Sequence, residues 1–397
     1  MKRSRLPVRS SPARKNSLLV VARSARPLAE MARAAGFEVH AIDLFGDEDT
    51  RRAARYTTAL TPTRQFDFKA GELLGAIAAH QAFHGPMPIV CGSAFERAPA
   101  LLASLARHYR VLGCDAEVYR RLLDLPTLFA SLRRTAGIAT PTTTWHAPVV
   151  TRGWLCKQVG GSGGYHVADV SAGTRARRGH YFQQRMYGAS CSALFIANGR
   201  ECRYYGCAEH LRWHAGASFR YEGARRLLQV PAKLRASLEQ IGALLTTRLA
   251  LRGCFGIDFL CCEDHRPVLL DINPRPTASL ELWPERPRMF SAHVAACTDQ
   301  TLLYSSPQVA TQRAHLVLYA DAPWQVHAGL DWPAWIADRP CAGTFIPRGA
   351  PLCTLLGEGA TSTALERNLL RRYQALRTLF GAPAQALLPA TINIRTR

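Results

Sequence analysis

The segment FGIDFLCCEDHRPVLLDINPR, residues 255–275, carries two aspartates and an asparagine at spacings that are typical of a functional site. Its alternation of apolar and polar residues predicts two strands joined by a four-residue turn, EDHR. That turn length places Asp258 opposite Asp271. Because successive side chains of a strand point to opposite faces, Asp258, Asp271 and Asn273 then share one face of the hairpin.

Two carboxylates that oppose each other across a hairpin repel, so a shared proton or a divalent cation must offset the cost. Mg²⁺ prefers oxygen ligands and is commonly held by one or two carboxylates together with substrate phosphates. Gly256 leaves room beside the Asn273 amide. The side chains expected to be buried on the other face are Phe255, Ile257, Phe259, Val268, Leu270 and Ile272. The alternative is a solvent-facing hairpin with scattered acids, and a turn of another length would weaken the pairing.

A second segment, WLCKQVGGSGGYHV at residues 154–167, places Lys157 on a predicted strand just before four glycines and a serine. Glycines let successive backbone N–H groups turn toward an anion, and a lysine adds a point charge. Alone, the loop is more typical of a flexible turn; together with the paired aspartates it indicates phosphate binding. The lysine precedes the glycines, which excludes the Walker pattern of P-loop NTPases.

Three features follow one another along the chain: a strand lysine, a glycine loop, and D…DIN followed by an arginine. This order resembles that of the ATP-grasp superfamily over residues 116–295. The resemblance implies two α+β subdomains that clamp ATP with Mg²⁺, for which Mn²⁺ is an alternative. It also implies a parallel-sheet domain ahead of them. The segment WIADRPCAGTFIPRGAPLCTLLGEG, residues 335–359, further resembles a little-characterised group of carboligase-like proteins related to biotin carboxylase.

The resemblance assigns the nucleotide contacts. Lys157 matches the lysine that contacts the phosphates. The loop expected to close over them consists of Gly160, Gly161, Ser162, Gly163 and Gly164. The stretch YFQQRMYG resembles the family's hinge, so Gln184 would approach the adenine amino group, while Arg185 and Met186 would offer backbone contacts.

The resemblance also assigns Asp258, Asp271 and Asn273 as Mg²⁺ ligands and Arg275 as the arginine near the transferred phosphoryl group. Two positions depart from the family pattern. Glutamate is common where this chain has Asp271. Many members carry an early lysine, but the corresponding place in this chain reads DLPTLF, with Pro126. Either an arginine substitutes for that lysine, or ATP has one contact fewer.

The elements that must position these residues begin with a βα pattern. The expected strands are residues 16–22, 37–45, 87–95 and 110–114, and the expected helices are residues 27–36 and 98–109. This alternation predicts a small parallel sheet. No GxGxxG follows the first strand, which argues against a dinucleotide site. Asp43 reads as a turn residue.

Farther along, an amphipathic helix over residues 119–137 is interrupted near Pro126, short strands follow, and helices are expected at residues 231–253 and 362–380. The fold class is therefore mixed, α/β and α+β. The expected divisions are a basic disordered tail at 1–16, a parallel α/β domain at 17–113, an ATP-grasp domain at 114–305 and a small C-terminal domain at 306–397. An organelle transit peptide is the alternative for the tail.

Composition restricts the partners. The net charge of +21 is spread along the chain as arginine, without a lysine-rich block or an RNA-binding signature, so nucleic acid is not expected. A basic surface also attracts anionic small molecules.

The twelve cysteines form no CxxC pair and sit in apolar runs, typical of reduced thiols in the cytoplasm. The pairs His80/His84 and His210/His214 lack nearby cysteines, so no structural zinc site is expected. No apolar run could span a membrane.

By resemblance, the expected activity is an ATP-dependent carboxylate–amine, or carboxylate–thiol, ligase that works through an acyl phosphate, with Lys157 and Arg275 stabilising the transferring group. The partners would be small carboxylates and amines, with an acidic substrate such as an amino acid, or a coenzyme precursor, among the candidates. Homodimers are common in the superfamily that the chain resembles. Glu209 and His210 could line the substrate pocket. The rival functions are a biotin-carboxylase-like carboxylation and a non-catalytic nucleic-acid-binding protein on a degenerate version of this fold.

Overall fold

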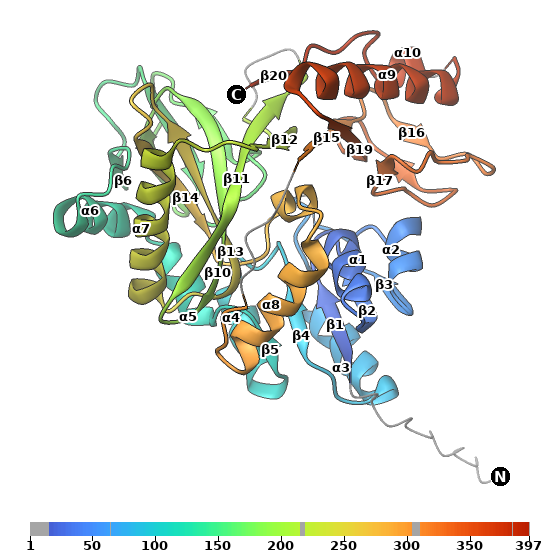
Figure 1. The fold of residues 1–397 in the computed structure, drawn as a ribbon, viewed down its shortest axis with the longest axis horizontal. Coiled ribbons are helices and arrows are strands. Elements are labelled where there is room, and N and C mark those ends of the chain that lie inside the picture. Colours follow the sequence, from blue (N-terminus) through green and yellow to red (C-terminus); the bar gives the residue numbers. More distant parts are fainter. Residues whose placement is uncertain (1–15, 64, 215–218, 304–309, 383, 397) are drawn as a thin grey trace.

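The computed structural model describes residues 16–396 except 64, 215–218, 304–309 and 383. Its N-terminal part is a parallel sheet with helices on both sides. The rest is built on a long antiparallel sheet and a smaller, four-stranded sheet (Figure 1). This agrees with the mixed α/β and α+β class expected from the sequence. Among the described helices, none has the length and apolar character needed to cross a bilayer.

The N-terminal sheet has the strand order β3-β2-β1-β4-β5, all parallel. Its elements are β1 (Ser17–Val21), α1 (Arg26–Ala34), β2 (Glu38–Asp43), α2 (Glu48–Ala53), β3 (Tyr56–Ala59), α3 (Ala70–His84), β4 (Ile89–Cys91), α4 (Pro99–His108) and β5 (Val111–Leu112). The central strand β1 reads SLLVV because both of its faces are covered. The expected parallel sheet is confirmed, although α2, β3 and α3 were not anticipated.

Two short helices lead into a four-stranded sheet. The helices are α5 (Ala116–Leu122) and α6 (Leu125–Ala136), and the strands are β6 (Thr143–Thr144), β7 (Trp154–Gln158), β8 (Val167–Asp169) and β9 (His180–Gln184), in the order β6-β9-β7-β8. The expected interruption near Pro126 lies where Asp124 accepts a hydrogen bond from Thr127 N at 3.2 Å and starts a new helix. Gly137, with φ 63°, ends it.

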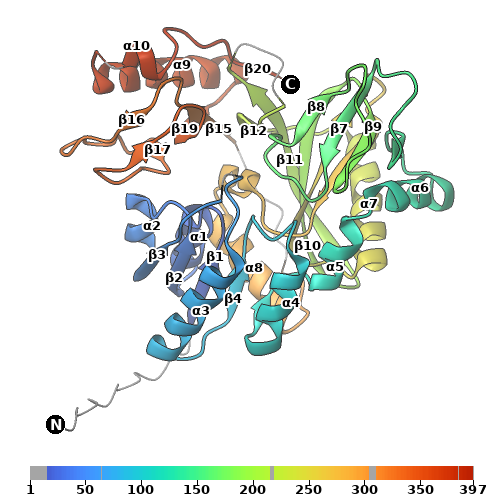
Figure 2. The ribbon, with the colours of Figure 1, turned by 180° about the vertical axis from the view of Figure 1, so that it is seen from behind.

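The long sheet runs β14-β13-β10-β11-β12-β15-β19-β17, and β20 pairs with β11. Its strands are β10 (Ala189–Asn198), β11 (Cys202–Arg212), β12 (Gly223–Arg226), β13 (Arg252–Cys261), β14 (Pro267–Asn273), β15 (Gln312–Tyr319), β17 (Ile336–Ala337), β19 (Pro351–Gly359) and β20 (Arg395–Thr396). Helix α7 (Ala232–Leu249) covers one face so closely that a Cβ on Gly242 would lie 2.4 Å from the Phe195 ring. The 3₁₀ helix η1 (Ala278–Leu282) and α8 (Arg286–Thr298) lead from this sheet back to the N-terminal one (Figure 2).

The C-terminal part continues the same sheet, because β15 pairs with β12 and β19 pairs with β15. Its remaining elements are β16 (Trp324–Gln325), β18 (Phe345–Ile346), α9 (Ser362–Phe380) and α10 (Ala384–Leu387). Helix α9 buries Leu369, Tyr373 and Leu376 against β15 and β19. Trp213, just after β11, joins that core, so the C-terminal part is attached through both backbone pairing and packing.

Candidate active site

The β13–β14 hairpin pairs Asp258 with Asp271 and Gly256 with Asn273, as the sequence predicted. Beyond Asp258 the register shifts by one residue, so that Phe259 faces Leu269. The turn is longer than the expected EDHR: Cys262 N donates to Arg266 O at 3.2 Å. The expected four-residue turn was therefore wrong, and a bulge at Leu270 restores the register at the aspartates.

The bulge also changes which leucine is buried. Leu269 is fully buried, whereas Leu270 is half-buried and lines the cleft described below. The expectation that Leu270 packs on the far face was wrong for this reason. The other side chains expected there are buried as predicted: Phe255, Ile257, Phe259, Val268 and Ile272.

The negative charges of the two facing aspartates are only partly compensated by the positive charges around them. Burial and the Asp258 carboxylate raise the pKa of Asp271 to about 7, and Lys157 and Arg275 offset only part of that rise. Asp271 Oδ1 accepts a hydrogen bond from its own neighbour, Ile272 N, at 2.8 Å. Two opposed carboxylates with a half-protonated member are the electrostatic situation that a divalent cation would relieve.

Asn273 completes an oxygen-rich donor set. Its Nδ2 donates to Asp258 Oδ2 at 3.2 Å, and its Oδ1 accepts from Arg275 Nη2 at 3.2 Å. The two ends of an amide have nearly the same shape, and a rotation would turn the carbonyl toward the aspartates. The residues present therefore fit a Mg²⁺ ion with phosphate oxygens in its remaining positions.

Arg275 connects this hairpin to the N-terminal sheet. Its buried guanidinium donates through Nε to Glu96 Oε1, and through Nη1 to Pro276 O at 3.2 Å. Burial alone would raise the pKa of Glu96, but Arg275 and Arg23 hold it below its usual range. The sequence analysis missed Glu96; its position shortly after β4, at the carboxyl edge of the parallel sheet, was the available signal.

The glycine loop, residues 160–164, follows Lys157 on β7, which pairs with Val167 on β8 and Tyr181 on β9. The loop packs on the N-terminal part, where Ser162 Oγ accepts from Arg23 Nη1 at 2.9 Å. A Cβ on Gly160 would lie 2.7 Å from Glu96 O. Glycine is required there by a close backbone approach.

The other end of the loop packs on the segment before β12. Tyr221 N donates to Gly163 O at 2.8 Å, and a Cβ on Gly164 would lie 1.8 Å from Phe219 O. His166, just after the loop, stands so close to Gly161 that a Cβ there would lie 2.2 Å from its ring. Burial and the charge of Lys157 lower the pKa of His166 to about 4.

The expected hinge, residues 181–188, covers most of β9 and leads into β10. The amides of Gln184 and Arg185 already donate to Thr142 O and Gly153 O, each at 2.8 Å. The Arg185 backbone contact with a base would therefore come from its carbonyl rather than its amide. The Arg185 side chain pairs with Asp169 at 2.9 Å, and Met186 is 39% exposed.

The sequence-predicted site residues line one cleft of about 1460 Å³ between the N-terminal sheet, the antiparallel sheets and the C-terminal part. The sequence-predicted residues that it brings together are Lys157, Gly160, Gly161, Ser162, Gly163, Gly164, Gln184, Arg185, Met186, Asp258, Asp271, Asn273 and Arg275. The volume suits a nucleotide and a second substrate together.

Beyond the hairpin, the cleft is lined by polar side chains that the sequence analysis mostly did not select. Ser192 stands opposite Asp258 on β10, and its buried Oγ has no hydrogen-bond partner among the described residues. His210 accepts or donates through Nδ1 to Ser190 Oγ at 3.0 Å. Glu209, considered together with His210, instead forms an ion pair with Arg225 at 2.7 Å and does not line the cleft.

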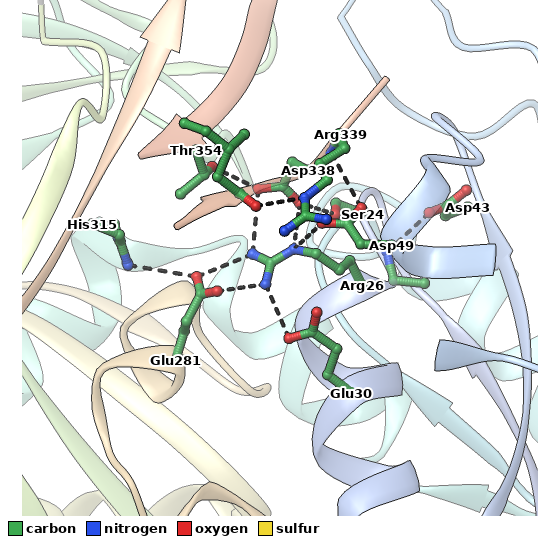
Figure 3. Close-up of polar contacts among 12 residues, drawn as sticks. Ser24, Arg26, Glu30, Asp43, Asp49, Glu281, His315, Asp338, Arg339 and Thr354 are labelled. Carbon is green, nitrogen blue, oxygen red and sulfur yellow. Dashed lines mark hydrogen bonds and ion pairs between the residues drawn. The ribbon is translucent and has the colours of Figure 1, made fainter. Parts of the chain in front are cut away.

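At the far end, three parts of the chain meet on Arg26, whose side chain is 1% exposed (Figure 3). It makes a two-pronged ion pair with Glu281, with Nη2 and Oε2 at 3.0 Å, and donates to Asp338 Oδ1 at 2.8 Å and Glu30 Oε2 at 3.3 Å. Burial would lower the pKa of Arg26, but Asp338 and Glu281 raise it well above its usual value. We call Arg26, Glu281, Asp338 and Glu30 the Arg26 junction.

The junction reaches the hairpin side of the cleft through two ring side chains. His315 Nδ1 lies 3.7 Å from Glu281 Oε2 (Figure 3). Its Nε2 shares a hydrogen bond of 2.7 Å with Tyr221 Oη. Tyr221 packs edge-on against His210, with ring centroids 5.5 Å apart. Asp43 lies beside the junction as a turn residue: its carboxylate accepts from Gly46 N at 2.8 Å and Ala25 N at 3.2 Å.

Known folds and families match this architecture. The family model described as an ATP-grasp domain matches residues 127–279. The structure is similar to a biotin carboxylase–βγ-ATP complex from Campylobacter jejuni, with TM-score 0.66, 12% identity, and 96% of this chain and 93% of that chain covered. No curated protein sequence matches the chain.

Two further solved structures have the same arrangement. The biotin carboxylase domain dimer of Hydrogenobacter thermophilus 2-oxoglutarate carboxylase, in complex with MgADP, ADP and bicarbonate, has TM-score 0.67 and 11% identity, covering 96% of this chain and 91% of that one. The N5-carboxyaminoimidazole synthetase of Staphylococcus aureus complexed with ADP has TM-score 0.61 and 13% identity, covering 93% and 98%. The chain therefore carries an ATP-grasp domain at residues 127–279, and its fold is similar to that of these structures along nearly its whole length.

Proposed function

We propose that this protein is an ATP- and Mg²⁺-dependent ligase that activates a small carboxylate as an acyl phosphate and transfers the acyl group to an amine. The observation that carries the proposal is the pairing of Asp258 with Asp271, with Asn273 on the same face, across one cleft from Lys157 and the glycine loop. The neighbours solved with nucleotides support the choice of ATP.

In the first step, a carboxylate oxygen of the substrate attacks the γ-phosphorus, the bond to the bridging oxygen breaks, and ADP leaves. Mg²⁺ on Asp258, Asp271 and Asn273 would neutralise charge on the phosphate oxygens. Lys157 and Arg275 would hold the transferring group in line with the attacking oxygen. The glycine loop would exclude water and aim backbone N–H groups at the phosphates.

In the second step, the amine nitrogen attacks the acyl carbon, the carbon–oxygen bond to phosphate breaks, and the amine loses a proton. The described part of the cleft offers His210 and Tyr221 on the side of the hairpin toward the Arg26 junction. Because Tyr221 Oη bonds to His315, which lies beside Glu281 of the Arg26 junction, and the Tyr221 ring packs against His210, we assign that end of the cleft to the acceptor.

The first test is a calorimetric titration of Mg-ATP into the wild type and into the Asp271→Ala and Lys157→Ala variants. We expect micromolar binding that requires Mg²⁺ and weakens by about 100-fold in Asp271→Ala, the effect typical of a lost metal ligand. Asp264→Ala, in the exposed turn of the same hairpin, is the matched control and should bind as the wild type does. Absence of Mg-ATP binding in the wild type would overturn the proposal.

The second test separates the reaction types. ADP release is measured with panels of carboxylic acids, each with and without amines, and with bicarbonate alone. Release that requires both an acid and an amine supports the ligase, and an acid with hydroxylamine should give a hydroxamate. Release with bicarbonate alone would favour carboxylation, the chemistry named for the biotin carboxylase neighbours.

A further inference from the structure

Three histidines converge on the N-terminal sheet, away from the cleft. His40 lies on β2, and His80 and His84 lie four residues apart near the end of α3, on one face of that helix. Each can offer one ring nitrogen, and these three atoms lie within 4.8 Å of one another. None of the three lines the cleft, so the proposed ligase chemistry does not use them.

The geometry of the three rings is close to that of a metal site. His40 Nδ1 and His80 Nε2 are 2.7 Å apart, and the His84 ring centroid lies 4.9 Å from that of His40 and 4.5 Å from that of His80. With Zn–N bonds of about 2.0–2.1 Å, the nitrogens of a tetrahedral site stand about 3.3 Å apart. An increase of about 0.6 Å in the distance between His40 Nδ1 and His80 Nε2 would therefore admit an ion.

The surroundings of His40 supply the outer contact that metal-bound histidines usually have. Its other nitrogen, Nε2, is buried and lies 3.6 Å from Glu38 Oε1. Glu38 is itself held by Arg55, whose Nη1 donates to Oε2 at 2.7 Å. A carboxylate behind a ligating imidazole fixes the ring and leaves the opposite nitrogen free for the metal.

The protonation state and access also suit a cation. Burial lowers the pKa of all three histidines, that of His80 to about 4, so the imidazoles are neutral near pH 7. His40 and His80 are 2% and 8% exposed, whereas His84 is half-buried beside Tyr56, which is 40% exposed. An ion would enter at His84 and keep a water molecule on that side.

We propose that His40, His80 and His84 bind a divalent transition-metal ion, with Zn²⁺ as the first choice, through three imidazole nitrogens and a fourth, water-filled position. Three neutral nitrogen ligands with one open position are a donor set that Zn²⁺ accepts, and the absence of carboxylate ligands disfavours Mg²⁺ and Ca²⁺. Glu38 would orient His40 and is a positioning residue. The site is distinct from the Mg²⁺ site of the proposed ligase reaction.

The test uses the untagged full-length chain, stripped of metal by a chelator and kept reduced. Zn²⁺ affinity is measured by competition with a chromophoric chelator. We expect one tight site per chain, weakened at least 100-fold in His84→Ala and in His80→Gln. His108→Ala replaces an exposed histidine at the end of α4 in the same part of the chain and is the matched control; its affinity should equal that of the wild type.

Two further measurements distinguish a metal bound by the histidines from a metal bound elsewhere and from a misfolded variant. Zn²⁺ should raise the melting temperature of the wild type but not that of His84→Ala, and Mg-ATP binding should be equal in both, which shows that the variant is folded. Tight Zn²⁺ binding that survives in His84→Ala and His80→Gln would assign the ion to cysteines and overturn the proposal. Failure of the wild type to bind Zn²⁺ would leave the three histidines a packing cluster only and would also overturn it.

Discussion

The β13–β14 hairpin and the Arg26 junction both gather carboxylates at the cleft, but they treat their charges in opposite ways. In the junction, Glu281 and Asp338 each have Arg26 as a direct partner. In the hairpin, Asp258 and Asp271 oppose each other, and although the Asn273 amide donates to Asp258, the pKa of Asp271 stays raised. In the first arrangement each carboxylate has a cationic partner within the protein, whereas in the second two facing carboxylates remain that a bound cation would compensate.

The pKa values follow this division. Burial would raise the pKa of Asp338, but Arg26 and the hydroxyl groups of Thr354 and Ser24 hold it below its ordinary value. For Asp271, burial and Asp258 together raise the pKa to about 7. We infer that the charges of the junction serve mainly to join three parts of the chain, while those of the hairpin serve to bind.

The largest expected effect is on the junction. Arg26→Ala leaves two buried carboxylates without their cation and should lower the free energy of unfolding by about 3–5 kcal/mol. Urea denaturation measures the loss. The control is Arg33→Ala on the same helix, an exposed arginine whose removal should change stability by less than about 0.5 kcal/mol. Unchanged stability of Arg26→Ala with loss of activity would instead place Arg26 among the substrate contacts.

A smaller stability effect of the opposite sign is expected at the hairpin. Because folding raises the pKa of Asp271, the protein without nucleotide loses stability as pH rises from about 4 to about 7, and the loss is complete above pH 7. Asp271→Asn removes this penalty. After allowance for solvent contact, it should stabilise the ligand-free protein by about 2 kcal/mol at pH 8 and by little at pH 4.

Thermal unfolding across pH, without nucleotide, measures that difference. The same variant should bind Mg-ATP poorly at every pH, so stability and binding move in opposite directions, as expected for a residue placed for function. If Asp271→Asn destabilises the ligand-free protein at pH 8, the carboxylate is satisfied within the fold, and the contrast with the junction is wrong.

The hairpin also shows how far the sequence could predict the site. Strand periodicity and two aspartates were enough to pair Asp258 with Asp271, because the bulge at Leu270 compensates the longer turn. The same reasoning misplaced Leu270, since a bulge depends on backbone geometry that no residue pattern in this segment announced. Local patterns therefore predicted the facing acids but not every side chain between them.

Local sequence patterns could not predict the Arg26 junction or the three-histidine cluster, because the residues of each are far apart in the chain. Arg26, Glu281 and Asp338 come from three separate segments, and His40 is forty residues from His80. Helix α3 was missed for a different reason: its sequence AGELLGAIAAHQAFH contains two glycines and mixes small apolar residues around the helix, so it has no clear amphipathic stripe. Without α3, no partner for His40 could be placed.

The glycine loop contacts both the N-terminal part and the segment before β12, and two adjacent glycines allow a matched test of its packing. Gly163 and Gly164 have φ of 70° and 76°, so alanine costs a similar backbone strain at each. Only at Gly164 would the added Cβ meet backbone, 1.8 Å from Phe219 O; at Gly163 it would meet only the Tyr165 side chain at 3.5 Å. We expect Gly164→Ala to weaken Mg-ATP binding about 10-fold more than Gly163→Ala, roughly 1.4 kcal/mol. Equal affinities would mean that the loop leaves Phe219 when nucleotide binds.

The smallest expected effect concerns the hydrogen bond from Arg23 Nη1 to Ser162 Oγ, which joins the loop to the N-terminal part. Arg23 also pairs with Asp67 at 3.0 Å, so its charge stays compensated when Ser162 is replaced. Ser162→Ala should therefore cost only about 0.5–1 kcal/mol, a few-fold in Mg-ATP affinity. A double-mutant cycle with Arg23→Ala measures the coupling between the two side chains. A coupling near zero would mean that Arg23 faces the substrate and that the loop is held by its glycines alone. A coupling as large as the single effects would mean that this hydrogen bond links closure of the loop to the N-terminal sheet.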